Sequence, residues 1–133
     1  MGDDPLRVPE YLGHILQAIQ RINRYTAGVD EAAFLGDELV QDAVIRNIEI
    51  VGEAAKNVAR HYPDFAAKHA DVPWDDMYLM RNRVSHGYVT VDLEIVWKTI
   101  QRDLPELEGR VGRLRSELAA GEESAGAGDD SSR

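Results

Sequence analysis

Apolar residues recur at helical spacing along most of the chain. Residues 9–22 carry one such stripe, formed by Leu12, Ile15, Leu16, Ile19 and Ile22. A broader apolar band follows between residues 37 and 61 at Val40, Ala43, Val44, Ile48, Val51, Ala54, Ala55 and Val58. Intervals of three and four residues place side chains on one face of a helix, and no alternating strand pattern of useful length accompanies them. The pattern predicts an all-α protein.

Capping residues and prolines predict where these helices begin and end. Gly28 ends the first segment, and Asp30 is expected to cap a short turn that reaches residue 34. Asp37 is a suitable N-cap for the long helix that runs to about residue 61. Tyr62-Pro63 stops that helix, because a proline disfavours helical geometry in the residue before it.

Prolines and capping residues also predict the helix boundaries in the second half of the chain. After a connector over 64–72, Pro73 opens a helix with acidic residues in its first turn. Asp92 caps a further helix, and Pro105 marks a new start or a kink in the apolar stripe that continues to residue 118. We expect one domain over 9–118, built as an antiparallel bundle of about five helices. Residues 1–8 and the Gly-, Ser- and acid-rich stretch 119–133 are expected to be disordered.

Gly52 is the one glycine in the middle of the long predicted helix. Glycine inside a helix lowers the stability of the helix by about 1 kcal/mol relative to alanine. Close packing of another helix at this position would offset that loss. The expected partner is the helix that starts at Pro73. Glu53 lies beside this expected helix–helix contact. A structural pairing with an arginine or with Lys56 is favoured for it over a catalytic role.

Residues 81–88, Arg-Asn-Arg-Val-Ser-His-Gly-Tyr, concentrate the candidate chemistry. Arginine binds phosphate through a two-pronged set of donors, and histidine suits proton transfer near neutral pH. Arg81 and His86 are five residues apart, about 140° around an ideal helix, so they diverge on an unbroken helix. Gly87 favours a helix end near Ser85 or His86, which would release the imidazole toward Arg81. Asn82 lies four residues before His86 and can contact it.

The pattern Arg81-x4-His86-x-Tyr88, with Asn82 after the arginine, resembles the signature of HEPN-domain proteins of the HepT type. Further matches are Pro73-Trp74, Gly52-Glu53-Ala54 and Asp92-Leu93-Glu94-Ile95-Val96-Trp97, so the resemblance covers roughly residues 9–118. It implies a HEPN-like helical bundle that forms a homodimer.

The resemblance also implies an activity. HepT proteins are toxins that act as metal-independent ribonucleases, and their partner is a minimal nucleotidyltransferase antitoxin of the MntA type that adenylylates the motif tyrosine. Arg81 and His86 would then be catalytic, with Asn82 and Ser85 in support, RNA as substrate and Tyr88 as the modified residue. One imidazole cannot easily act as both acid and base from one place, and two motifs joined across a twofold axis would supply both.

Other interpretations of the motif remain open. Judged by the residues alone, Tyr88 serves equally well as a modification site or as a structural hydrogen-bond donor, and only the resemblance favours modification. The chain could also be a non-catalytic helical binding subunit of a nucleotidyltransferase, or a dimerisation module. Packing is the favoured role for Trp74 and Tyr78 over stacking on a base.

Composition narrows these possibilities. The net charge of −9 argues against a general nucleic-acid binder, so RNA cleavage requires a local positive patch. There is no cysteine, no apolar run long enough to span a membrane and no basic, apolar leader, from which we expect a cytoplasmic protein without disulfides. No metal or cofactor is expected, because His61 and His69 lack ligands at suitable spacing; His14 should be an exposed surface residue.

Overall fold

The computed structural model describes residues 5–85 and 92–131, with the side chains of residues 5–81 and 92–121. Its helices are α1 (Val8–Thr26), α2 (Glu31–Leu35), α3 (Glu38–His61), α4 (Pro63–Lys68), α5 (Trp74–Ser85), α6 (Leu93–Lys98), the π-helical segment η1 (Thr99–Asp103) and α7 (Leu104–Ser131). No strand occurs in these ranges, so the prediction of an all-α bundle is confirmed. The helices beyond the expected five or so are short ones, α2, α4 and α6.

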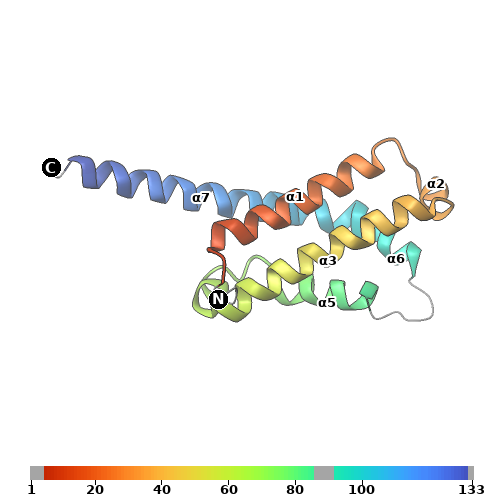
Figure 1. Ribbon diagram of the computed structural model, residues 1–133, viewed down its shortest axis with the longest axis horizontal. Coiled ribbons are helices and arrows are strands. Elements are labelled where there is room, and N and C mark those ends of the chain that lie inside the picture. Colours follow the sequence, from red (N-terminus) through yellow and green to blue (C-terminus); the bar gives the residue numbers. More distant parts are fainter. Residues whose placement is uncertain (1–4, 86–91, 132–133) are drawn as a thin grey trace.

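The long helices run in alternating directions, as Figure 1 shows. Helix α3 is central: it packs along α1 on one side and along α5 on the other, and α7 closes the bundle against α1. The predicted apolar stripes meet in one core, in which Ile15, Ile19, Val44 and Ile48 are fully buried. Phe34 of α2 stacks at a ring-centroid distance of 5.3 Å on Trp97 of α6, which anchors the two short helices to each other.

Aspartates begin three of the helices, as predicted. The side chain of Asp30 accepts a hydrogen bond of 2.8 Å from the Ala33 amide, and that of Asp37 accepts one of 3.1 Å from the Val40 amide. Asp92 accepts from the amides of the second and third residues after it, at 3.1 and 3.2 Å. Each carboxylate thereby satisfies an amide that the first helical turn leaves without an intrahelical partner.

The irregularity expected at Pro105 is a π-helical segment. The Leu104 amide bonds to the Thr99 carbonyl, five residues earlier, immediately before the proline. Proline has no amide hydrogen and its ring crowds the carbonyl four residues before it, so a wider turn at this point accommodates it within a continuing helix. The prediction of a new start or kink here is confirmed in this form.

The described residues include parts of both chain ends, for which disorder remains a prediction. In the predicted N-terminal lead, the Leu6 amide donates to the Tyr11 hydroxyl at 3.0 Å and the Leu6 carbonyl accepts from the Tyr62 hydroxyl at 2.7 Å. At the other end α7 continues to Ser131 (Figure 1). Alanine and glutamate are good helix formers, and extending an existing helix avoids the cost of nucleation.

Candidate active site

Helices α3 and α5 cross in close contact at Gly52. A Cβ atom placed on Gly52 would lie 2.2 Å from the Cβ of Arg81 and 3.0 Å from the carbonyl oxygen of Met77. These atoms belong to or adjoin the backbone of α5 and cannot move away alone, so any larger residue at position 52 would force the two helices apart. The predicted approach of the motif helix to Gly52 is confirmed, and the base of the Arg81 side chain occupies the space that a side chain at residue 52 would fill.

Groups from both helices surround the Arg81 guanidinium. The Glu53 carboxylate lies 3.8 Å from Arg81 Nε, and the Arg81 side chain is 26% exposed. The carbon at the centre of the guanidinium lies 6.0 Å from the ring centroid of Tyr78, and the Lys56 ammonium lies 5.1 Å from the same centroid. The pairing predicted for Glu53 is therefore with Arg81, and Tyr78 packs near two cations, in line with the packing role favoured for it.

Arg81 opens onto a groove of about 540 Å³ between α1 and α3. The groove is lined by Leu6, Tyr11, His14, Arg46, Glu49, Ile50, Glu53, Ala54, Asn57 and Arg81. The cations Arg46 and Arg81 face the same space as two carboxylates, so the positive charge is local and interspersed with acids. This arrangement supplies anion-binding groups despite the acidic balance of the whole chain.

The remaining predicted site residues have different outcomes. The side chains of Asn82 and Ser85, and all of His86 and Tyr88, lie outside the described residues. Trp74 is buried, its indole N–H donates to the His69 carbonyl at 3.2 Å, and its ring lies beside Phe65, so packing is its role. His14 is exposed, as predicted.

Sequence reasoning missed that His14 and Arg46 share the groove with Arg81. A signal for Arg46 exists in retrospect: Arg46, Glu49, Glu53 and Asn57 recur every three or four residues along one side of α3. The sequence alone does not show what this polar stripe faces. The crossing at Gly52 places Arg81 on the same side of α3, and the stripe then becomes part of the lining of the groove.

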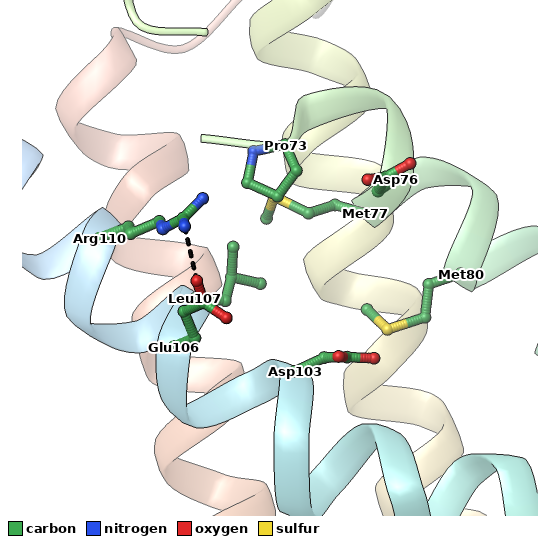
Figure 2. A pocket seen from close by; sticks show the side chains of 8 residues that line it. All are labelled: Pro73, Asp76, Met77, Met80, Asp103, Glu106, Leu107 and Arg110. Atoms are coloured by element: carbon green, nitrogen blue, oxygen red, sulfur yellow. Dashed lines mark hydrogen bonds and ion pairs between the residues drawn. The ribbon is translucent and has the colours of Figure 1, made fainter. Parts of the chain in front are cut away.

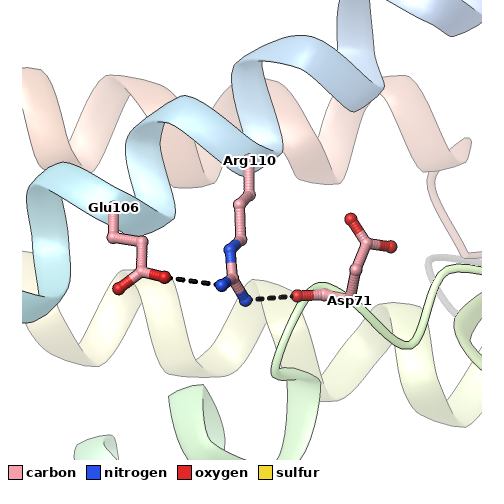
Figure 3. A network of polar contacts seen from close by, with 3 residues as sticks. All are labelled: Asp71, Glu106 and Arg110. Carbon is pink, nitrogen blue, oxygen red and sulfur yellow. Dashed lines mark hydrogen bonds and ion pairs between the residues drawn. The ribbon is translucent and has the colours of Figure 1, made fainter.

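A second pocket of about 450 Å³ lies between α5 and the η1–α7 region (Figure 2). Its lining residues are Pro73, Asp76, Met77, Met80, Asp103, Glu106, Leu107 and Arg110. The Arg110 guanidinium is already bound to the Glu106 carboxylate and, at 2.6 Å, to the Asp71 carbonyl (Figure 3). With its arginine engaged and three carboxylates at its rim, this pocket is unsuited to phosphate, and the groove at Arg81 is the candidate active site.

Within the described ranges, no three histidine or acidic side chains cluster closely enough to hold a metal ion. None of the helices described is both long and apolar enough to cross a bilayer.

Comparison with known proteins identifies the family. Residues 15–114 match the family described as "Ribonuclease HepT-like". The chain belongs to the HepT-like ribonuclease family. A protein of Thermococcus cleftensis named "Probable ribonuclease HepT" is 41% identical over 106 residues, which cover 80% of this chain and 94% of that protein. The resemblance noted in the motif and its flanks is thereby confirmed.

Another relative in the HepT-like family comes from Caldanaerobacter subterraneus subsp. tengcongensis and is named as a candidate RNase. It is 38% identical over 104 residues, covering 78% of this chain and 90% of that protein. No solved structure matches the chain. Membership of this family makes the chain a ribonuclease and directs attention to Arg81, which lies inside the matched range.

Glu53→Gln tests whether this carboxylate orients the Arg81 guanidinium. Because half of the Glu53 side chain is exposed, we expect little change in the free energy of unfolding. We expect kcat for RNA cleavage to fall by up to about fivefold, which is the change in rate that corresponds to the free energy of an exposed ion pair. If an RNA phosphate binds at Arg81, KM should fall as well, since a negative charge beside that phosphate is removed.

Steady-state kinetics of Glu53→Gln beside Asp42→Asn, an exposed acid on the same helix, provides the comparison. If kcat and KM of Glu53→Gln match those of Asp42→Asn, Glu53 does not position Arg81.

Proposed function

We propose that this chain is the toxin of a toxin–antitoxin pair, an endoribonuclease that cleaves RNA without a metal ion through attack by the ribose 2′-hydroxyl. The observation that carries the proposal is the seating of Arg81, whose side chain lies over Gly52, pairs with Glu53 and faces an open groove. An arginine that is fixed at its base and lines an open groove is suited to binding a phosphate that enters from solvent.

The chemistry requires one base, one acid and one cation. His86 takes the proton from the 2′-hydroxyl, and the 2′ oxygen attacks phosphorus. The bond from phosphorus to the 5′ oxygen breaks, that oxygen receives a proton, and a 2′,3′-cyclic phosphate remains. Arg81 stabilises the added negative charge on the phosphoryl oxygens during this step. DNA is not cleaved, because it lacks the attacking hydroxyl.

A homodimer supplies the second imidazole. Two copies related by a twofold axis would bring both motifs to one site, so that one His86 acts as base and the other as acid. Support comes from Leu79 of α5, which is 51% exposed although it is a large apolar residue on the motif helix. Burial of Leu79 against a second α5 would remove this apolar surface from water.

Control of the toxin is assigned to Tyr88 and to a minimal nucleotidyltransferase antitoxin of the MntA type. Transfer of AMP to the tyrosine hydroxyl adds a negatively charged phosphodiester and a bulky nucleoside two residues after His86. The added charge repels the RNA phosphate and the nucleoside blocks its approach, which silences the enzyme.

A cleavage assay on total RNA, with and without EDTA, tests this function. Wild-type protein is expected to cleave equally in both conditions and to leave cyclic phosphate ends, whereas His86→Ala should lose at least about 100-fold in rate, the contribution of general acid–base catalysis. An oligonucleotide with a 2′-deoxy sugar at the cleaved position should resist cleavage. Loss of activity in EDTA, or equal activity of His86→Ala, contradicts the proposal.

A further inference from the structure

The groove contains polar side chains that the proposed cleavage step does not use. Arg46, Glu49 and Asn57 all line it, and none makes a side-chain hydrogen bond or ion pair with another described residue. Glu49 and Asn57 are half-buried. Half-buried polar groups without protein partners on one cavity are suited to a polar ligand.

The rest of the groove lining is apolar. Ile50 and Ala54 lie on α3 between the polar residues, and Leu6 and Tyr11 add apolar surface from the first segment of the chain. Tyr11 is only 5% exposed and its hydroxyl is bound to the Leu6 amide, so this surface is fixed in place. An apolar floor with polar groups at its edges can hold the flat face of a nucleobase.

The two arginines of the groove are spaced along α3. Arg46 precedes Glu53, the partner of Arg81, by seven residues, which corresponds to about 10 Å along a helix. A phosphate bound at Arg46 can therefore be a different one from the phosphate at Arg81, and both can belong to one RNA strand. The groove can thus hold the part of the RNA strand next to the bond that is cleaved.

We propose that this groove binds a guanine nucleotide of the RNA close to the scissile phosphate, an inference that rests on the proposed ribonuclease function. Arg46 binds the phosphate of that nucleotide. The base lies on Ile50 and Ala54, and its hydrogen-bonding edge faces the Glu49 carboxylate.

The preference for guanine follows from the chemistry of the carboxylate. An ionised carboxylate only accepts hydrogen bonds, and its two oxygens can accept two parallel ones. Guanine presents two adjacent donors, N1–H and the 2-amino group. Adenine and cytosine present one amino group beside an acceptor nitrogen, and uracil presents one N–H between two carbonyls. Glu53 is paired with Arg81, which leaves Glu49 as the carboxylate available for the base.

Binding of mononucleotides to the full-length protein tests the site independently of cleavage. Calorimetric titration with guanosine 3′-monophosphate should give a Kd about tenfold lower than with adenosine 3′-monophosphate, the discrimination typical of a bidentate pair. Inosine 3′-monophosphate lacks the 2-amino group, and its Kd should lie between those of the guanosine and adenosine nucleotides. Glu49→Gln should abolish the preference, and Arg46→Gln should weaken all three by a similar factor.

Arg113→Gln is the matched control, because Arg113 is an exposed arginine on α7 outside the pockets described above. Equal affinity for the guanosine and adenosine nucleotides, or a preference that survives Glu49→Gln, overturns the inference even if the wild type cleaves RNA. Guanosine nucleotide binding that depends on Glu49 in a protein that leaves RNA intact supports the groove assignment and contradicts the nuclease proposal.

Discussion

Arg81→Ala is expected to lower kcat for RNA cleavage by roughly 10²–10³-fold, the usual effect of removing one group that stabilises the developing charge of a transition state. Arg81 faces the groove from a position fixed by Gly52 and Glu53. Single-turnover cleavage of a defined RNA oligonucleotide measures the effect. The free energy of unfolding, measured in parallel, should stay high enough to keep the protein folded at the assay temperature.

Arg81→Lys separates charge from geometry. Lysine keeps the positive charge but lacks the planar set of donors that holds a phosphate at two oxygens. We expect activity between that of wild type and Arg81→Ala. Arg113→Ala, which removes an exposed arginine of α7, should cleave at the wild-type rate. Cleavage by Arg81→Ala at the rate of Arg113→Ala would remove Arg81 from the mechanism.

Gly52→Ala is expected to destabilise the fold by about 1–3 kcal/mol or more, the usual cost of forcing extra volume into a packed interior. The added Cβ would lie 2.2 Å from the Arg81 Cβ and 3.0 Å from a backbone oxygen, so α3 and α5 must separate along their contact. The higher helix propensity of alanine, worth about 1 kcal/mol, offsets only part of this cost. Arg81 moves with α5, and cleavage should fall as well.

Gly109→Ala is the matched control for this substitution. Gly109 also lies inside a long helix, α7, but nothing lies within 4 Å of a Cβ placed there. Alanine should therefore stabilise the protein by up to about 1 kcal/mol through helix propensity alone. Urea denaturation of both variants gives the comparison. A Gly52→Ala protein that is stabilised as much as Gly109→Ala would show that the two helices do not meet so closely in solution.

Local chemistry in the sequence determined the helices and most of their boundaries. The aspartates at 30, 37 and 92 act as caps because an N-cap depends on amides only two or three residues away. The apolar stripes are buried because a 3.6-residue period fixes which side chains share a face. Helix α7 extends to Ser131, beyond the last position of the predicted apolar stripe at residue 118, because extending an existing helix avoids the cost of nucleation.

Tertiary structure alone decided what lies around Arg81. The sequence indicated that a helix would approach Gly52, because glycine inside a helix needs a reason of that kind. It could not indicate that Arg81 is the residue placed there, or that Arg46 and His14 share its groove, because these residues are separated by 29 or more positions. Their proximity depends on the rotation and crossing of three helices about their axes, which no local pattern specifies.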